Sequence, residues 1–246
     1  MKNFVVNLNR QPEKYESFLR RNAGSKIAFE RFEASEGASL SPQDARAMNL
    51  VVSGAQFTPG AVGCAASHFR IWQQTVQSEV PALVFEDDAI IRNDIAERLD
   101  FLRRLGNWDY IALGYNTDSV LELELAPGFK SEMMFTPKQP SDDSAAMFQR
   151  STAEVAALRL VQCFGTAGYV VSPRGATKLL ELCFPMENRF LKIAALNRTV
   201  PVLGIDGMMN FIYHSIEAFA CVSPLVIPKN NNAVSTTVPT GEIPRW

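Results

Sequence analysis

Three consecutive acidic residues, Glu86, Asp87 and Asp88, form the stretch of this 246-residue sequence that is most informative about chemistry. They lie between two apolar runs, residues 83–85 and 89–91, that are typical of buried strand. Neighbouring carboxylates repel one another and are disfavoured in an apolar setting. A divalent cation with oxygen ligands compensates such charge, and it commonly carries phosphate oxygens as further ligands. The acidic motif therefore predicts a metal site suited to a diphosphate.

A solvated turn at the end of a strand is the alternative interpretation of the same three acids. After a plain turn we expect Gly, Asn or Pro, whereas here the apolar sequence resumes directly at Ala89. We therefore expect the acids at the carboxyl end of a strand, where open α/β sheets bind their ligands.

The length and composition of the chain indicate one α/β domain. A chain of 246 residues with 47% hydrophobic content can bury a large core. We expect a single domain over residues 1–229 and a loose polar tail over residues 230–246. A net charge of −2 and a pI near 5.8 give no basic footprint for nucleic acid, which is not expected as a partner.

The cysteines and the apolar segments bear on the compartment. The four cysteines are widely spaced without a C-x-x-C pair, which argues against a zinc knuckle or a redox motif and favours a reduced, cytoplasmic setting. The apolar run at residues 4–6 is too short for a signal peptide, and no stretch reaches the roughly 20 apolar residues that span a bilayer. Any contact with a membrane is expected to be peripheral.

Alternating strand and helix patterns must position the acidic motif. Residues 4–8 and 27–34 read as strands on either side of a helix from Glu13 to Asn22. No G-x-G-x-x-G or Walker sequence follows either strand, which argues against a dinucleotide oxidoreductase and a P-loop enzyme. A helix over residues 94–105 and a strand over residues 108–114 follow the acidic motif, and this order indicates parallel pairing.

A largely buried helix is expected just before the acidic strand. Apolar residues recur at steps of three and four between Val62 and Val76. Small residues near its start, Gly60 and Gly63 among them, would let a ligand approach backbone N–H groups, and a helix amino terminus favours anions such as diphosphate. His68 lies on a fairly apolar face and, on this pattern alone, is a core histidine.

The second half of the sequence is less regular. Residues 116–150 are interpreted as a long functional loop that selects the second substrate, and Asp142-Asp143 within it as a solvated loop or a rival metal pair. Order returns with a strand at residues 169–171, which leads into a helix that Ser172 caps. An apolar run then leads to Asp206, which either caps a helix over residues 207–216 or belongs to the site. A last strand is expected over residues 218–227.

Several short motifs occur in a recognisable order along the chain. They are Asn7-Leu8-Asn9-Arg10, Gly63-Cys64-Ala65-Ala66-Ser67-His68 with Trp72, the acidic motif, Gly165-Thr166-Ala167-Gly168-Tyr169-Val170 with Gly175-Ala176, and Ile205-Asp206. From residue 3 to about residue 228 the sequence resembles family 25 glycosyltransferases. These are bacterial lipopolysaccharide and lipooligosaccharide glycosyltransferases, often galactosyltransferases.

The resemblance implies a fold, a donor and a metal. The fold would be a GT-A-like, Rossmann-like nucleotide-sugar-binding domain with a central, mostly parallel sheet. The donor would be a UDP-sugar, UDP-galactose first among the candidates, and Mn²⁺ or Mg²⁺ would be held at the acidic motif. Asp88, assisted by Glu86 or Asp87, would bind the metal that bridges the diphosphate. The residues implied to line or approach the donor are Asn7, Leu8, Arg10, Gly63, Ser67, His68 and Asp87.

The same resemblance implies a saccharide acceptor, either a glycolipid or an oligosaccharide of lipopolysaccharide, and hence peripheral contact with the inner membrane. The chemistry of sugar transfer agrees with it. Departure of a nucleoside diphosphate places charge on phosphate oxygens, and the sugar carbon becomes oxocarbenium-like. An inverting enzyme also needs a carboxylate as general base for the acceptor hydroxyl. Asp206 is the first candidate for this catalytic base, with Asp142 or Asp143 behind it.

Two other functions are compatible with parts of the pattern. The first is a non-catalytic module of the same fold that binds a nucleotide or glycan without turnover. The second is a phosphohydrolase that uses an acidic strand end with magnesium. The phosphohydrolase is the weaker alternative, because no accompanying arrangement of Lys and Thr is found.

Overall fold

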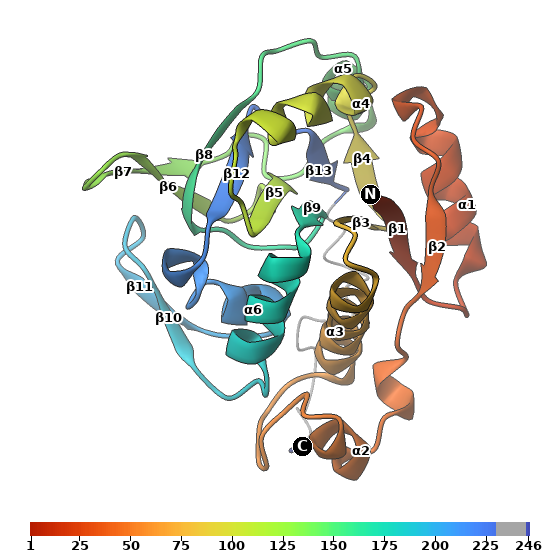
Figure 1. Ribbon diagram of the computed structural model, residues 1–246, viewed down its shortest axis with the longest axis vertical. Coiled ribbons are helices and arrows are strands. Elements are labelled where there is room, and N and C mark those ends of the chain that lie inside the picture. The colour runs from red at the N-terminus through yellow and green to blue at the C-terminus, as the bar shows by residue number, and fades with distance from the viewer. Residues whose placement is uncertain (230–244) are drawn as a thin grey trace.

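The computed structural model describes residues 1–229 and 245–246, with residues 101–103 described by their backbone alone. A large central sheet forms the middle of the molecule, and helices cover both of its faces (Figure 1). In spatial order its strands are β2 (Glu30–Glu33), β1 (Lys2–Asn7), β3 (Ala82–Glu86), β9 (Gly168–Val171), β5 (Tyr110–Gly114), β12 (Ala218–Val222), β8 (Ala156–Gln162), β6 (Val120–Ala126) and β7 (Phe129–Met134).

The remaining elements surround this sheet. The helices are α1 (Pro12–Arg21), α2 (Pro42–Ala47), α3 (Pro59–Ser78), α4 (Ile95–Arg98), α5 (Asp142–Gln149), α6 (Pro173–Cys183) and α7 (Ile205–Met209). The 3₁₀ turns are η1 (Ala23–Ser25), η2 (Gly37–Ser39), η3 (Leu99–Arg104) and η4 (Tyr213–Ser215). Two small antiparallel pairs complete the fold: β4 (Ala89–Ile91) with β13 (Val226–Pro228), and β10 (Phe190–Ile193) with β11 (Arg198–Pro201).

The direction of the strands confirms the predicted α/β class with a mostly parallel central sheet. β1 pairs in parallel with β2 and β3, and β5 pairs in parallel with β12. β9, β8 and β7 run antiparallel to their neighbours. Six of the nine strands in the described part of the sheet therefore share one direction. This is the arrangement expected of a GT-A-like domain.

The predicted parallel pairing of the strand at residues 108–114 with the acidic strand is wrong. β3 and β5 do run in the same direction, but β9 lies between them and is antiparallel to both. Sequence order could not show this, because β9 comes much later in the chain and inserts between two strands that a helix connects.

The start of α6 was predicted correctly, because the signal for a helix start is local. Ser172 Oγ accepts a hydrogen bond from the Gly175 N–H and caps α6, as expected. Thr58 caps α3 in the same way, through the Ala61 N–H. The helix expected over residues 94–105 is present as α4 followed by η3.

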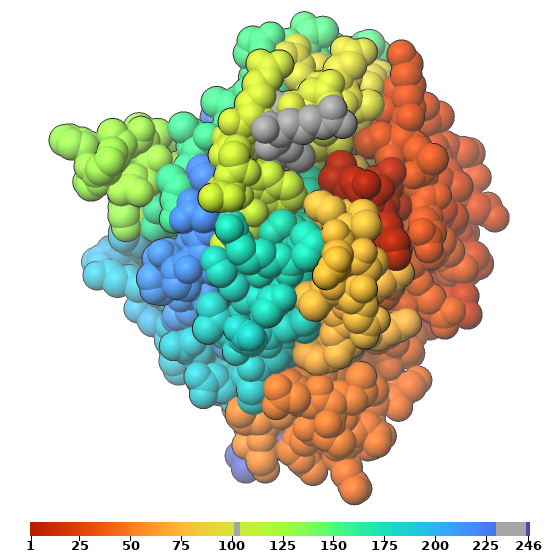
Figure 2. Space-filling view, in the orientation of Figure 1, coloured from red at the N-terminus to blue at the C-terminus, as the bar shows by residue number. Residues whose placement is uncertain are grey.

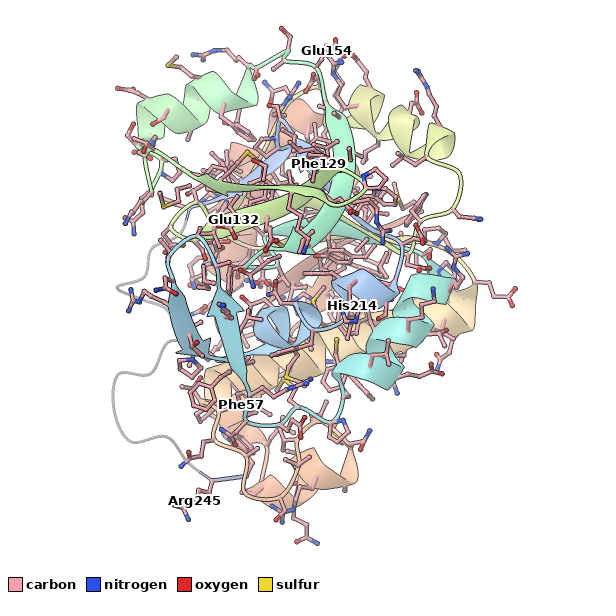
Figure 3. The ribbon with its side chains drawn as sticks, turned by 90° about the vertical axis from the view of Figure 1, so that its left-hand side faces the viewer. Phe57, Phe129, Glu132, Glu154, His214 and Arg245 are labelled. Carbon is pink, nitrogen blue, oxygen red and sulfur yellow. The ribbon has the colours of Figure 1, made fainter. Side chains whose placement is uncertain are left out.

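The long loop expected over residues 116–150 is instead a β-hairpin, β6–β7, followed by α5. The hairpin projects from the body of the molecule, and Figure 3 labels Phe129 and Glu132 on it (Figures 2 and 3). Apolar and acidic residues alternate in β6, and Pro127-Gly128 form its turn, so the signal was a strand period of two that was missed. Asp142 and Asp143 are exposed in the first turn of α5, which Ser141 caps.

Other boundaries in the second half also differ from the predictions. The stretch between residues 184 and 202 contains the hairpin β10–β11, and β8 was not expected. The helix predicted over residues 207–216 is the short α7 followed by η4, and the predicted last strand divides into β12 and β13. Among the described residues no helix has both the length and the apolar content needed to cross a bilayer.

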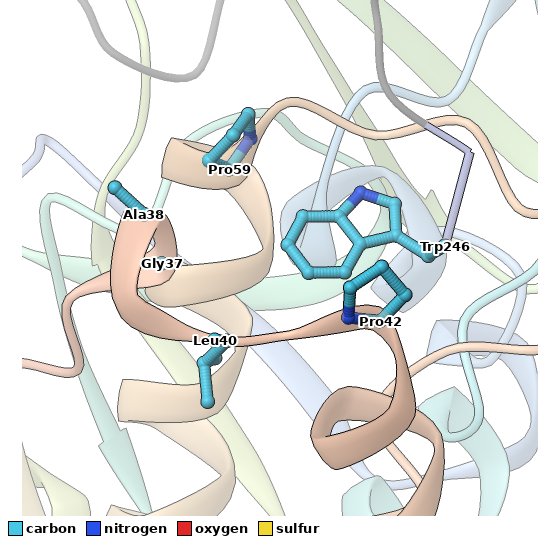
Figure 4. A pocket seen from close by; sticks show the side chains of 6 residues that line it. All are labelled: Gly37, Ala38, Leu40, Pro42, Pro59 and Trp246. Atoms are coloured by element: carbon cyan, nitrogen blue, oxygen red, sulfur yellow. The ribbon is translucent and has the colours of Figure 1, made fainter.

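The end of the chain is not loose at its last two residues. The prediction for residues 230–244 lies outside the described residues, but Trp246 is 4% exposed and its Nε1 donates to the Phe57 carbonyl at 2.7 Å. The backbone of Arg245 forms an isolated antiparallel β-bridge with Gln56. Trp246 packs beside η2 and the start of α3, where it lines a small pocket with Gly37, Ala38, Leu40, Pro42 and Pro59 (Figure 4). No charged side chain is among these lining residues.

Candidate functional site

The acidic motif lies where β3 ends. Glu86 is the last residue of β3, and Asp87 and Asp88 form the turn that leads into β4. All three residues are partly buried. Because β1 and β3 are parallel and in register, with Val6 opposite Glu86, their carboxyl ends meet at one edge. Asn7 Nδ2 donates to Asp87 Oδ2 at 2.7 Å, so the structure brings together two of the predicted site segments.

Arg31, which the sequence did not single out, orients the end of β1. From β2, its Nε donates to Asn7 Oδ1 at 2.9 Å, and its Nη2 donates to the Leu8 carbonyl at 3.2 Å. The amide oxygen of Asn7 is thereby occupied, and its NH₂ group faces Asp87. Burial raises the pKa of Asp87, and neighbouring Glu86 adds to this rise, against the opposing effect of the Asn7 bond. Arg10 is exposed and forms an ion pair with Glu36.

Glu86 is held by two other elements. Its Oε1 accepts a hydrogen bond from Thr166 Oγ1 at 2.7 Å and lies 3.3 Å from His68 Nε2. Burial alone would raise the pKa of Glu86, but the hydrogen bonds from His68 and Thr166 outweigh it, so the pKa is lowered. Glu86 is therefore an ionised carboxylate with defined partners.

His68 belongs to a buried chain of hydrogen bonds. Its Nδ1 lies 2.8 Å from the Tyr169 hydroxyl, which also accepts from Trp72 Nε1 at 3.1 Å. An ionised carboxylate only accepts, so His68 donates from Nε2 to Glu86. His68, Trp72 and Tyr169 are each fully buried.

Gly63 and Ser67 lie on the same helix but contact the protein's own backbone. A Cβ on Gly63 would come within 2.6 Å of the Gly37 nitrogen and 2.7 Å of the Ser35 carbonyl oxygen. Ser67 Oγ donates to the Gly63 carbonyl and accepts from the Ser35 N–H at 2.8 Å. Gly63 and Ser67 therefore hold the segment before η2 in close contact with α3. Donor contacts at Gly63 and Ser67 stay predictions.

Asp206 does not cap its helix. The N-cap of α7 is Gly204, and Asp206 lies in the first turn. Its Oδ2 accepts a hydrogen bond from the Gly165 N–H at 2.9 Å. Two residues further on, the Ala167 carbonyl accepts from the Glu86 N–H at 3.2 Å. The segment from Gly165 to Ala167 therefore ties Asp206 and Glu86 to the same backbone, a connection that the sequence did not reveal.

Cys64 lies beside Glu86, because its Sγ atom and a carboxylate oxygen of Glu86 are within 4.8 Å of each other. Burial raises the pKa of the Cys64 thiol, and the negative charges of Glu86 and then Asp206 raise it further. The catalytic role of Asp206 stays a prediction, but its position is compatible with work beside the acidic motif.

Two sets of groups are candidate metal ligands. Within the described residues, the ligand atoms of Cys64, His68 and Glu86 lie within 4.8 Å of one another. In that set both ring nitrogens of His68 already have hydrogen-bond partners. The acidic turn, Glu86 to Asp88, offers partly buried carboxylate oxygens. Hard oxygen donors fit Mn²⁺ or Mg²⁺ better than a soft thiol does, so the donor set of the acidic motif fits the expected metal.

The fold and site together define an α/β protein with a carboxylate-rich ligand site at the strand ends. Residues 1–193 match the family model of glycosyltransferase family 25, described as an LPS biosynthesis protein. The chain belongs to this family.

Individual relatives cover different shares of the chain. Human procollagen galactosyltransferase 2 is 23% identical over 209 residues, which cover 81% of this chain and 30% of that protein. A putative glycosyltransferase of Haemophilus influenzae is 25% identical over 236 residues, covering 93% of this chain and 72% of that protein. The mouse inactive glycosyltransferase 25 family member 3 is 28% identical over 142 residues, which cover 51% of this chain and 24% of that protein. The chain spans about 30% of the length of the curated relatives that it matches first.

Proposed function

We propose that this protein is a metal-dependent glycosyltransferase that moves a sugar from a UDP-sugar donor to a saccharide acceptor. Galactose is the first candidate for the sugar, and lipopolysaccharide or lipooligosaccharide for the acceptor. The observation that carries the proposal is the Asn7–Asp87 hydrogen bond, because it joins the polar end of β1 to the acidic end of β3. Membership of family 25 and the galactosyltransferase name of a relative support it.

The proposed roles follow from the chemistry of each group. Asp88, with Glu86 or Asp87, would hold Mn²⁺ or Mg²⁺, which when bound neutralises charge on the departing diphosphate. Asn7, Leu8 and Arg10 at the end of β1 would line the nucleotide pocket, with Gly63, Ser67 and His68 of α3 near the donor.

Asp206 is proposed as the general base for the acceptor. In an inverting transfer its carboxylate takes the proton of the acceptor hydroxyl as that oxygen forms the bond to the anomeric carbon. The Gly165 N–H donates to one of its two carboxylate oxygens, which orients the side chain.

A cytoplasmic location with peripheral contact at the inner membrane belongs to the same proposal. A lipid-linked saccharide acceptor would bring the protein to that surface. All four cysteines are free thiols, which is consistent with a reducing compartment.

The experiment that tests the function is release of UDP from UDP-galactose with Mn²⁺ and a lipooligosaccharide acceptor. We expect the Asp88→Asn variant to lose turnover by about 100-fold or more, because a developing charge loses its stabilisation. Its melting temperature should stay close to that of the wild type. Asp143→Asn, on exposed α5, is the matched control and should keep full activity. Near-normal turnover in Asp88→Asn would remove the metal assignment.

A non-catalytic binding module is the second candidate, and the name of the mouse relative shows that the family includes a protein described as inactive. Such a module would gain thermal stability from a UDP-sugar with Mn²⁺, since a ligand of the native state raises its melting temperature. It would release no UDP. The same assay therefore separates the two functions.

A further inference from the structure

Glu86 differs from Asp87, the next residue, in the direction that its side chain takes. Side chains alternate along β3, where Val84 packs in the core layer of α3 and Phe85 packs in the opposite layer. Glu86 lies two positions after Val84 and so points toward α3, where it meets His68. Asp87 comes one position later and contacts Asn7 of β1 instead.

The protein itself uses an oxygen of Glu86. Oε1 accepts from Thr166 Oγ1 at 2.7 Å and from His68 Nε2 at 3.3 Å. The backbone N–H of Glu86 donates to the Ala167 carbonyl at 3.2 Å. A carboxylate oxygen has two lone pairs, so this oxygen is filled before a metal arrives. Glu86 joins β3 to the start of β9 and to α3.

A chain of hydrogen bonds continues behind His68. Trp72 Nε1 can only donate, so the Tyr169 hydroxyl accepts from it; the same hydroxyl is bonded to His68 Nδ1, and His68 Nε2 donates to Glu86. Thr166 is 8% exposed, and His68, Trp72 and Tyr169 are fully buried. A satisfied buried network of this kind rigidifies its members, and removing one partner leaves the next group unpaired.

We propose that Glu86 is a positioning residue, anchored by Thr166 and by the Trp72–Tyr169–His68 chain, and that Asp87 and Asp88 are the metal ligands in the turn that this anchor fixes. The inference rests on the proposed function, whose metal site it narrows from three carboxylates to two. It also gives Thr166 and Tyr169 a role: they act on the metal site through Glu86.

The test measures binding of Mn²⁺ itself, by the electron paramagnetic resonance signal of the free ion, to the full chain without donor or acceptor. Glu86→Gln keeps the accepting oxygen and the shape, so its dissociation constant should rise far less than that of Asp88→Asn. We expect the Mn²⁺ dissociation constant to rise about 100-fold in Asp88→Asn, which loses a ligand, and at most about tenfold in Glu86→Gln, which loses a neighbouring charge. Glu86→Ala removes the anchor and should bind more weakly than Glu86→Gln.

Variants that keep every carboxylate test the anchor separately. Thr166→Val keeps the shape but loses the hydroxyl and should weaken Mn²⁺ binding by about tenfold, as outer-shell partners do. Thr166→Ser should restore it, which a role in packing alone would not predict. Tyr169→Phe should raise the donor KM, whereas Tyr213→Phe should not. Tyr213 is the matched control, because it is also a buried tyrosine, and its hydroxyl contacts Cys163 Sγ, at 3.5 Å, and Tyr110 rather than His68.

Each outcome has a definite consequence. Equal loss of Mn²⁺ binding in Glu86→Gln and Asp88→Asn would overturn the positioning role and make Glu86 a ligand, while the proposed transferase would stand. Loss of Mn²⁺ binding in a Cys64→Ala variant would place the ion at the Cys64–His68–Glu86 group and would also overturn the positioning role of Glu86. A wild-type chain that binds no Mn²⁺ would remove both this inference and the metal-dependent function.

Discussion

The side chain of Asp206 depends on one backbone N–H, that of Gly165. Gly165 has a φ of +82°, and a Cβ there would lie 2.1 Å from Asn116 Oδ1. A glycine is required at this point to present the N–H to the carboxylate. The sequence suggested Asp206 because it follows an apolar run, but its partner lies in a different motif, 41 residues earlier.

At the scale of single residues, Asp206→Asn tests the general base. The amide keeps the size of the side chain but cannot accept the acceptor's proton. We expect kcat to fall by about 100-fold or more, while the KM for UDP-galactose changes little. Initial rates of UDP release at saturating Mn²⁺ measure both values.

The corresponding control is Asp142→Asn, which changes the rival base on exposed α5 and should leave kcat unchanged. If instead Asp206→Asn turns over at the wild-type rate and Asp142→Asn does not, the base belongs to α5.

What the sequence predicted at this scale were residue types and not their partners. The acidic motif stood out because charge in an apolar run is costly wherever the chain folds. The roles of Thr166, Tyr169 and Arg31 could not be predicted, because each depends on a side chain from another element. Such pairings are set by sheet order, which a single sequence does not display.

At the scale of elements, α3 is placed by close backbone contact as well as by its apolar face. Gly37 and Gly63 face one another, and a Cβ on Gly37 would lie 1.7 Å from the Pro59 carbonyl oxygen. Small residues at the start of this helix were interpreted as room for a ligand. At Gly63 that room is filled by the chain itself.

Gly63→Ala should therefore destabilise the protein. The new methyl group would meet backbone atoms that cannot move aside cheaply, and we expect a loss of about 2 kcal/mol in the free energy of unfolding. Urea denaturation followed by tryptophan fluorescence measures it. Gly204→Ala is the control, since the nearest atom to its Cβ would be Asp206 Oδ1 at 3.5 Å, an ordinary contact. Equal stability of the two variants would contradict the packing role of Gly63.

The same contrast explains which elements were predictable. Helices α2, α3 and α6 begin with a Ser or Thr cap followed by Pro, a signal contained in two neighbouring residues. Strands β7 and β11 expose much of their surface, so their apolar pattern is weak. The sequence of β8 alone does not show its two faces, because these are defined by the strands that it pairs with, β12 and β6, which come from other parts of the chain.

At the scale of the whole molecule, Asp109 joins three separate parts of the chain. It precedes β5 and is fully buried, and its carboxylate accepts from Lys178 Nζ at 2.6 Å, from Arg174 and from the Glu217 N–H at 2.9 Å. Burial alone would raise the pKa of Asp109, but these partners outweigh it and the pKa is lowered. Asp109 thus ties β5 to α6 and to the segment before β12.

Asp109→Asn should lower the free energy of unfolding by about 2 kcal/mol at neutral pH. The loss is smaller than that expected for a fully buried ion pair, because Arg174 and Lys178 reach solvent. A lowered folded-state pKa gives stability that is complete above the unfolded value, near 3.9 for Asp. That stability is lost as the pH falls through the folded value. The difference in unfolding free energy between wild type and variant should therefore shrink below about pH 4. A difference that stays constant between pH 7 and pH 3 would contradict this role.

The position of β9 also has a consequence for folding of the chain during its synthesis on the ribosome. β3 can pair with β1 as soon as it is made, but the edges of β3 and β5 that finally pair with β9 stay without that partner until β9 is made. Until then the nascent chain exposes two facing rows of unpaired backbone groups, which can recruit strands from other chains. The centre of the sheet can close only after β9 has been made, so we expect the nascent chain to be prone to aggregation until then.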